Sequence, residues 1–186
     1  LPLSIVPGLY EFAKVNGCGL ITYQGEGVIS AFEPDKYVQL EARINGIPIK
    51  VVDNFVEYVN FDINKCLMTA PEEIAPELEK QLQEKYSDVA SIYRSEPFFI
   101  EIMPKDVNKA TSLDHMLEGM GLTRENAICC GDGYNDISMI EYAGTGVAMG
   151  NAQPAVKEAA DYITGTNDED GLVEVIDKFI MKPEQA

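Results

Sequence analysis

Two aspartates and an asparagine stand close together in this sequence, directly after a short apolar run. Asp132, Asn135 and Asp136 lie in the segment GDGYND at 131–136, and the apolar run occupies 127–130. Carboxylates gathered in this way favour a hard cation, and Mg²⁺ bound by one or two carboxylates commonly shares its remaining positions with phosphate and water. Acidic residues also cap helices, but capping explains one aspartate and not the whole cluster. The cluster therefore predicts a cation site.

The pattern around this cluster places it at the edge of a parallel sheet. The short apolar run closed by a glycine is typical of a buried strand, and apolar residues at helical spacing follow it. After Pro104, strands and helices alternate, which predicts a parallel sheet with right-handed crossovers. Ligands bind at the carboxyl edge of such sheets. The predicted helices are 108–120, 135–142, 153–160 and 170–180, and the predicted strands are 127–130, 146–149 and 162–163.

The first half of the sequence is mixed and contains a predicted hairpin around the glycines of 25–27. We therefore predict an α/β protein with two modules, an α+β module at 1–97 and a parallel-sheet module at 98–186. The predicted helices of the first module are 4–14, 34–43 and 71–86, and its predicted strands are 19–23, 28–32, 63–69 and 89–93. A further strand, predicted at 98–103, begins the second module.

Charge and cysteine content exclude several classes of partner. The net charge is −17, with 31 acidic against 14 basic residues. Nucleic acids and anionic membranes require positive charge, so neither is expected as a partner. No apolar run approaches the ~20 residues of a membrane helix. The four cysteines form no CxxC pair, which fits a reducing, cytoplasmic compartment.

The second half resembles the haloacid dehalogenase-like (HAD) superfamily of phosphohydrolases, in its Cof-type branch. The matching segments, which follow the order of that family, are 100–109, 131–136, 146–152, 156–161 and 167–171. The resemblance implies that the second half is the C-terminal part of a Rossmann-like HAD core. The first half resembles the mobile cap domain of that branch.

The resemblance also implies a reaction and roles for individual residues. It implies hydrolysis of small phosphorylated metabolites, such as sugar phosphates, through an aspartyl-phosphate intermediate. Asp132 would be a direct Mg²⁺ ligand, and Asp136 would support the water shell of the metal. Lys109 would hold the phosphoryl oxygens and orient the nucleophile, while Asn135 would donate its amide to the phosphate. Arg94 is a further candidate for substrate binding, because a guanidinium suits phosphate or carboxylate.

The sequence departs from the family pattern at the nucleophile. The family carries it in a DxDGT-type motif after a buried strand, and the DEDG at 168–171 does not follow such a strand. We therefore expect the chain to lack the N-terminal lobe of the family and to be inactive by itself. A parallel sheet without that lobe exposes an edge, so we expect self-association or binding to the missing lobe.

Two other functions fit part of the pattern. The phosphorylation domain of a P-type ATPase shares the GDGxND block, but the first half has no recognisable nucleotide-binding motif. A non-catalytic relative that binds phosphate ligands without cleaving them would fit the missing nucleophile. The retention of Lys109, Asp132, Asn135 and Asp136 argues against that reading, because together they form half of a working site.

Overall fold

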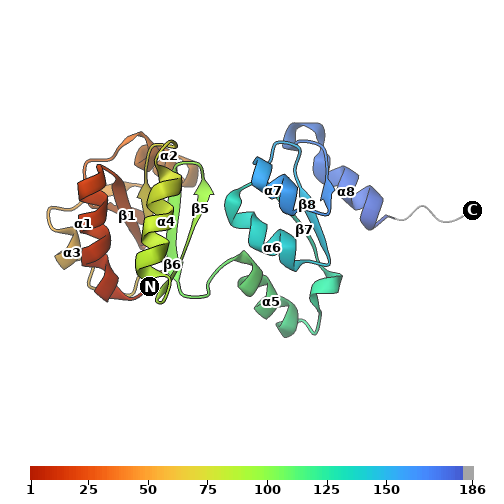
Figure 1. Ribbon diagram of the computed structural model, residues 1–186, viewed down its shortest axis with the longest axis horizontal. Helices are drawn as coiled ribbons and strands as arrows, with labels where there is room; N and C mark the ends of the chain where they lie inside the picture. Colours follow the sequence, from red (N-terminus) through yellow and green to blue (C-terminus); the bar gives the residue numbers. More distant parts are fainter. Residues whose placement is uncertain (182–186) are drawn as a thin grey trace, which may run out of the picture. The chain divides into compact units, whose positions relative to one another are not determined.

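The computed structural model describes residues 1–181, which fall into two compact units (Figure 1). Unit 1 is Leu1–Val107 and unit 2 begins at Asn108. The boundary lies later than the expected 97/98, because the strand β6 (Phe99–Pro104) pairs on both sides with strands of unit 1. Apolar alternation along a segment predicts a strand but does not identify the sheet that it joins.

Unit 1 is built on a six-stranded sheet in the order β3-β2-β1-β4-β6-β5. All of its pairs are antiparallel except β2 with β3, which run parallel. The other strands are β1 (Gly19–Gln24), β2 (Gly27–Ser30), β3 (Ile49–Val51), β4 (Cys66–Thr69) and β5 (Ala90–Glu96). The helices are a short η1 (Leu3–Ile5), α1 (Val6–Asn16), α2 (Lys36–Asn45), α3 (Phe55–Tyr58) and α4 (Ala75–Tyr86).

The two faces of this sheet bury different sets of side chains. Leu20 and Met68 point to the larger cluster, beneath α1, α3 and α4, while Ile21 and Leu67 point to a smaller cluster with Val38 of α2. Successive strand residues alternate between faces, so β1, β2, β4 and β6 each contribute to both clusters. Figure 1 shows α1 and α4 in front of the strands.

Local signals set the bounds of α2. The Asp35 side chain accepts hydrogen bonds from the backbone N–H groups of Tyr37 and Val38, both at 2.8 Å, as an N-cap should. Gly46 ends the helix with φ +64°, a conformation that glycine adopts without strain. β3 and α3, in contrast, were not predicted from the sequence.

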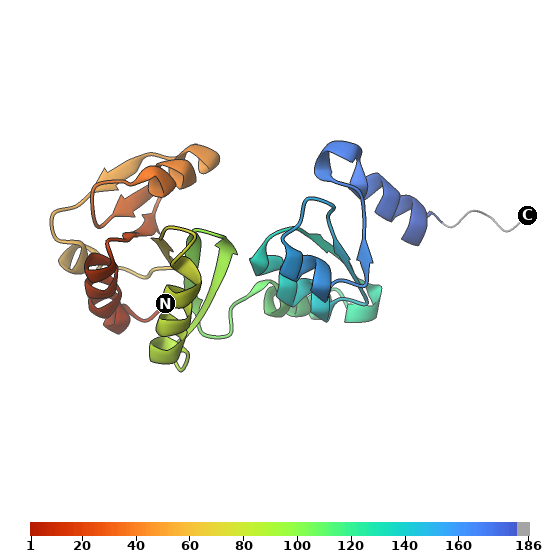
Figure 2. The same cartoon turned by 45° about the horizontal axis from the view of Figure 1, so that its top comes forward.

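Unit 2 is built on a three-stranded parallel sheet in the order β7-β8-β9. Its core joins Ile140, Ala148 and Val156, which come from α6, β8 and α7. The predicted alternation after Pro104 is confirmed (Figure 2). The strands are β7 (Ile128–Gly131), β8 (Thr145–Ala148) and β9 (Tyr162–Ile163); the helices are α5 (Lys109–Gly119), α6 (Ile137–Tyr142), α7 (Pro154–Ala159) and α8 (Gly171–Phe179), with 3-10 turns η2 (Arg124–Asn126), η3 (Tyr134–Asp136) and η4 (Asn167–Glu169).

Residues 1–181 contain no helix that is both long enough and apolar enough to cross a membrane.

Candidate functional site

Asp136 is the buried centre of the segment that follows β7. Its side chain is 7% exposed. Its Oδ2 accepts hydrogen bonds from the backbone N–H groups of Asp132 (2.9 Å) and Gly133 (3.1 Å). Its Oδ1 accepts a hydrogen bond from the Lys109 ammonium. A buried carboxylate is tolerated when it is paired and hydrogen-bonded, and here both oxygens are engaged.

Gly131, the last residue of β7, makes room for this carboxylate. A Cβ at position 131 would lie 2.4 Å from Cβ and 2.7 Å from Oδ2 of Asp136. Those distances are far below van der Waals contact, so a side chain at this position would displace Asp136. The glycine that closes the strand is therefore required by the site.

Lys109 reaches Asp136 from the first turn of α5. The helix begins there because Asn108 and Thr111 form a capping box, in which the Asn108 side chain accepts a hydrogen bond from the Thr111 N–H at 3.0 Å. The Lys109 side chain is 44% exposed. One of its three donors is held by Asp136, and an ammonium can give the others to an anion.

Asp132 points differently from Asp136. It is exposed, and its Oδ2 accepts a hydrogen bond from the Asn151 side-chain amide at 2.9 Å. The carbonyl oxygen Oδ1 of Asn151 accepts a hydrogen bond from the Asn167 N–H at 3.1 Å. These contacts join the segments that follow β7, β8 and β9, at the carboxyl edge where ligands bind.

Unit 2 thus brings together four of the five residues predicted from the sequence. Lys109, Asp132 and Asp136 are linked by hydrogen bonds, and Asn135 lies half-buried in η3 between the two aspartates. Asn151 was missed, although it follows the predicted strand 146–149 at the same edge of the sheet. Its position after that strand was the sequence signal that could have identified Asn151 as a site residue.

Arg94, the fifth predicted residue, belongs to β5 of unit 1. Its Nε donates to Glu79 Oε2 at 2.8 Å and its backbone N–H to Glu79 Oε1 at 3.1 Å. Both side chains are largely buried. These bonds fix β5 to α4 and give Arg94 a structural task, while its contact with a substrate stays a prediction.

The donor set at Asp132 is compatible with Mg²⁺. No group of three or more His, Cys, Asp or Glu side chains within residues 1–181 could hold a metal ion. The two aspartates divide their tasks, because Asp136 is turned inward and Asp132 outward. Mg²⁺ often uses only one or two protein carboxylates together with substrate phosphate and water, so the exposed Asp132 suits that mode of binding.

The thiols of β7 are packing groups rather than reactive ones. Burial raises the pKa of the Cys129 thiol, and the neighbouring Cys130 and Asp136 raise it further. Burial also raises the pKa of Cys130. The thiolate is the nucleophile and the metal ligand, so a raised pKa disfavours both roles beside the site.

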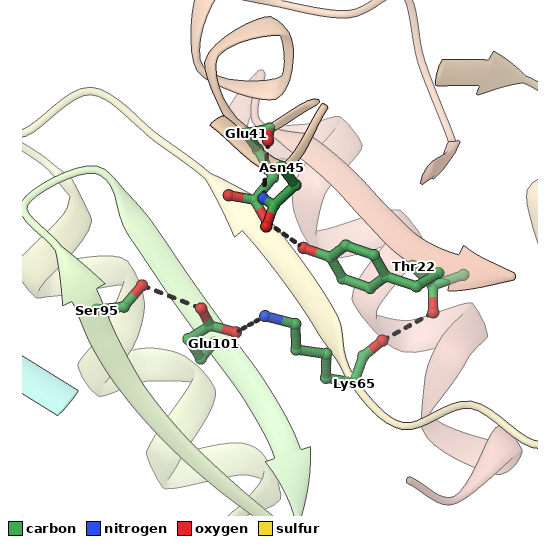
Figure 3. Close-up of polar contacts among 7 residues, drawn as sticks. Thr22, Glu41, Asn45, Lys65, Ser95 and Glu101 are labelled. Carbon is green, nitrogen blue, oxygen red and sulfur yellow. Dashed lines mark hydrogen bonds and ion pairs between the residues drawn. The ribbon is translucent and has the colours of Figure 1, made fainter. Parts of the chain in front are cut away.

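Unit 1 carries a separate polar cluster on the α2 face of its sheet (Figure 3). The Lys65 ammonium lies 3.0 Å from Oε2 of Glu101, and Ser95 donates to Oε1 at 3.0 Å. From the other face of β1, the Thr22 hydroxyl donates to the Lys65 carbonyl oxygen at 2.7 Å. Tyr93 lies opposite Glu101 in the β5–β6 pair, and burial together with that negative charge raises its pKa to about 12. Glu101 thus depends on Lys65 for its countercharge.

A profile of the haloacid dehalogenase-like hydrolase family matches residues 1–176. The chain belongs to this family. Among curated proteins, the chain is 36% identical to the 5-amino-6-(5-phospho-D-ribitylamino)uracil phosphatase YitU of Bacillus subtilis, covering 96% of this chain and 67% of YitU. It is 50% identical over 90 residues to YcsE, which carries the same phosphatase name in that organism.

Solved structures of the family share the fold. A haloacid dehalogenase-like hydrolase from Bacteroides thetaiotaomicron superposes with a TM-score of 0.78 at 45% identity, over 95% of this chain and 66% of that one. The HAD subclass IIB sugar phosphatase BT4131 gives a TM-score of 0.82 at 29% identity, over 96% and 67%. The HAD fold and the Cof-type branch expected from the motifs are confirmed.

The chain spans only part of these HAD relatives. The match to YcsE covers 48% of this chain and 36% of YcsE. For two proteins named putative phosphatases, from Streptococcus pyogenes and Haemophilus influenzae, the match covers 54% and 53% of their length. The names of these relatives refer to the complete proteins, of which this chain matches only a part.

We predict that Gly131→Ala disrupts the site. The added methyl group would push Asp136 off Lys109 and lower the free energy of unfolding by about 1–3 kcal/mol. Urea unfolding measures the loss. Gly119→Ala is the matched control, because a Cβ at that position meets nothing within 4 Å and alanine favours a helix. Equal stability of the two variants would contradict the packing described for Asp136.

We also predict that Lys65→Met destabilises unit 1. The Glu101 side chain, 11% exposed, would lose its countercharge, at a cost of about 1–3 kcal/mol in urea unfolding. The double variant Lys65→Met/Glu101→Met should recover most of that loss. Lys80→Met removes an exposed ion pair with Glu84 and should change little. A single variant as stable as the double would show that the pair carries no such energy.

Proposed function

We propose that this chain forms the cap and part of the core of a Mg²⁺-dependent phosphatase that acts on small phosphorylated metabolites. The observation that carries the proposal is the site at the carboxyl edge of β7. There, Asp136 anchors the Lys109 ammonium, and Asp132 stays exposed beside it. Family membership and the phosphatase names of the relatives agree with this reading.

The proposed chemistry matches the groups at this edge. Phosphoryl transfer depends mainly on positioning and on neutralising charge on the phosphoryl oxygens. Lys109 would bind those oxygens, and the Asn135 amide would donate to them as a neutral group. Mg²⁺ held at Asp132, when bound, would supply the remaining positive charge. Asp136 would hold Lys109 and the segment after β7 in place and support the water shell of the metal.

The family reaction passes through an aspartyl-phosphate, which splits one difficult displacement into two easier ones. We propose the same intermediate for this protein, on an aspartate other than Asp132 and Asp136. Lys109 would orient that nucleophile as well as the phosphate.

The substrate class follows from the relatives and from unit 1. YitU and YcsE are named for a phosphoribityl compound and BT4131 for sugar phosphates, so we propose a polyhydroxylated phosphate ester. Unit 1 would act as the cap that selects the leaving group, with Arg94 as a candidate contact. All four cysteines are free thiols, in agreement with a reducing, cytoplasmic location.

We predict that Asp132→Asn abolishes most of the activity of the polypeptide encoded by the complete gene. Assayed with Mg²⁺ on a panel of phosphate esters, the variant should lose ~100-fold or more in kcat/KM, because one charged ligand is removed. Asp177→Asn, an exposed substitution on α8 with the same change of charge, should leave kcat/KM unchanged.

Two results would each overturn part of the proposed function. One is full activity of the Asp132→Asn variant, which would remove the metal assignment. The other is the absence of hydrolysis of every ester tested, together with binding of inorganic phosphate by the unchanged protein, which would favour the non-catalytic phosphate-binding relative instead.

A further inference from the structure

We propose that Asn151 is a positioning residue that holds the Asp132 carboxylate in the orientation needed for cation binding. The inference rests on the proposed function, in which Asp132 is the metal ligand. It adds a residue from the segment after β8 to a site otherwise made by α5 and the segment after β7.

The Asn151 amide is used at both of its ends. Its NH₂ group donates to Asp132 Oδ2 at 2.9 Å, and its carbonyl oxygen accepts the Asn167 N–H at 3.1 Å. A carboxylate only accepts and a backbone N–H only donates. A flipped amide would therefore face an acceptor with its oxygen and a donor with its NH₂ group, so the two partners fix one orientation of the side chain.

The segment that anchors Asn151 is itself well held. Glu174 of α8 accepts hydrogen bonds from the Gly165 N–H (3.0 Å) and the Thr164 hydroxyl (2.9 Å). Thr166 forms a capping box with Glu169 at η4. The Asn167 N–H that meets Asn151 therefore projects from an ordered turn.

The segments after β8 and β9 also approach each other closely at Gly150. The Gly150 N–H donates to the Gly165 carbonyl at 3.0 Å, and a Cβ on Gly150 would lie 2.8 Å from the Thr166 nitrogen. This glycine next to Asn151 lets the two backbones meet. Asn151 is thereby placed between the turn at 164–167 and Asp132.

The hydrogen bond from Asn151 orients the Asp132 carboxylate without neutralising its charge. An exposed aspartate on a loop samples several rotamers, and ordering it on binding costs affinity. The Asn151 amide satisfies one carboxylate oxygen with a neutral donor, so the negative charge remains for a cation. Outer-shell partners of metal ligands typically change metal affinity by 10–100-fold when they are removed.

The test uses Mn²⁺ as the probe on the intact chain, followed by paramagnetic broadening of the backbone amide signals of Asp132 and Gly133 in NMR spectra. We expect Asn151→Ala to weaken Mn²⁺ binding by about 10-fold or more. Asn167→Pro is the matched control. It removes the N–H that anchors Asn151, together with the Asn167 side-chain amide that donates to Asp168 Oδ1. The substitution lies at the first position of η4, where proline is tolerated, and after Thr166, which is already extended. We expect an intermediate loss for it, about 2–5-fold, because the donor to Asp132 is kept.

A second readout needs no metal. In the metal-free chain, the side-chain NH₂ signals of Asn151 should shift when Asp132 is replaced by Asn, while the thermal unfolding midpoint of Asn151→Ala should stay within a few degrees of the unchanged chain. Unshifted signals would overturn the contact itself. Equal Mn²⁺ affinity of the unchanged chain and Asn151→Ala would overturn the positioning role alone. No broadening at Asp132 in the unchanged chain would overturn both this role and the metal part of the proposed function.

Discussion

One buried carboxylate organises the candidate site. Asp136 accepts an ammonium hydrogen bond from α5 and two backbone hydrogen bonds from the segment after β7. Removing a carboxylate from water is costly unless its oxygens are well satisfied, so these contacts are coupled to one another. The start of α5, the end of β7 and the start of α6 are held together through a single side chain. Gly131 takes part by having no side chain, since any Cβ would occupy the space of Asp136.

The two aspartates of the GDGYND segment therefore have opposite tasks. Asp136 accepts three hydrogen bonds from the protein and fixes the position of Lys109. Asp132 gives one oxygen to a neutral amide and keeps its charge toward solvent. A site in which donors and charges are fixed before the ligand arrives needs no reorganisation when it binds. The arrangement places a partly exposed cation and an exposed anion at one edge of the sheet, and the proposed phosphate and divalent ion would need both charges.

The sequence predicted the elements of unit 2 and the position of its polar cluster, because hydrophobic periodicity and the glycine after a buried strand are local signals. It did not predict which way each carboxylate points, since that depends on donors supplied by α5 and by residues far along the chain, such as Asn151. It also missed β3, which has only three residues, two of them exposed, and is too short for a periodicity to be recognised. For a related reason, the sequence placed residues 98–103 with the second module, whereas the structure pairs them with strands of unit 1. The periodicity of β6 identified a strand, but its partners Cys66 to Thr69 and Ala90 to Glu96 are known only from pairing.

The position of β6 in its sheet has a consequence for the order in which the protein is made. β6 lies between β4 and β5, and β5 is the terminal strand in the described order. During synthesis, β5 is therefore translated before β6, the strand that connects it to the sheet. The six-stranded sheet of unit 1 cannot be completed until Pro104 has left the ribosome. Unit 2 differs, because β7, β8 and β9 are neighbours in both sequence and space, so its sheet can grow strand by strand. The chain that follows Pro104 thus leaves unit 1 from a strand with neighbours on both sides. A pulling force on that chain would act at once on the hydrogen bonds of β6 with β4 and with β5.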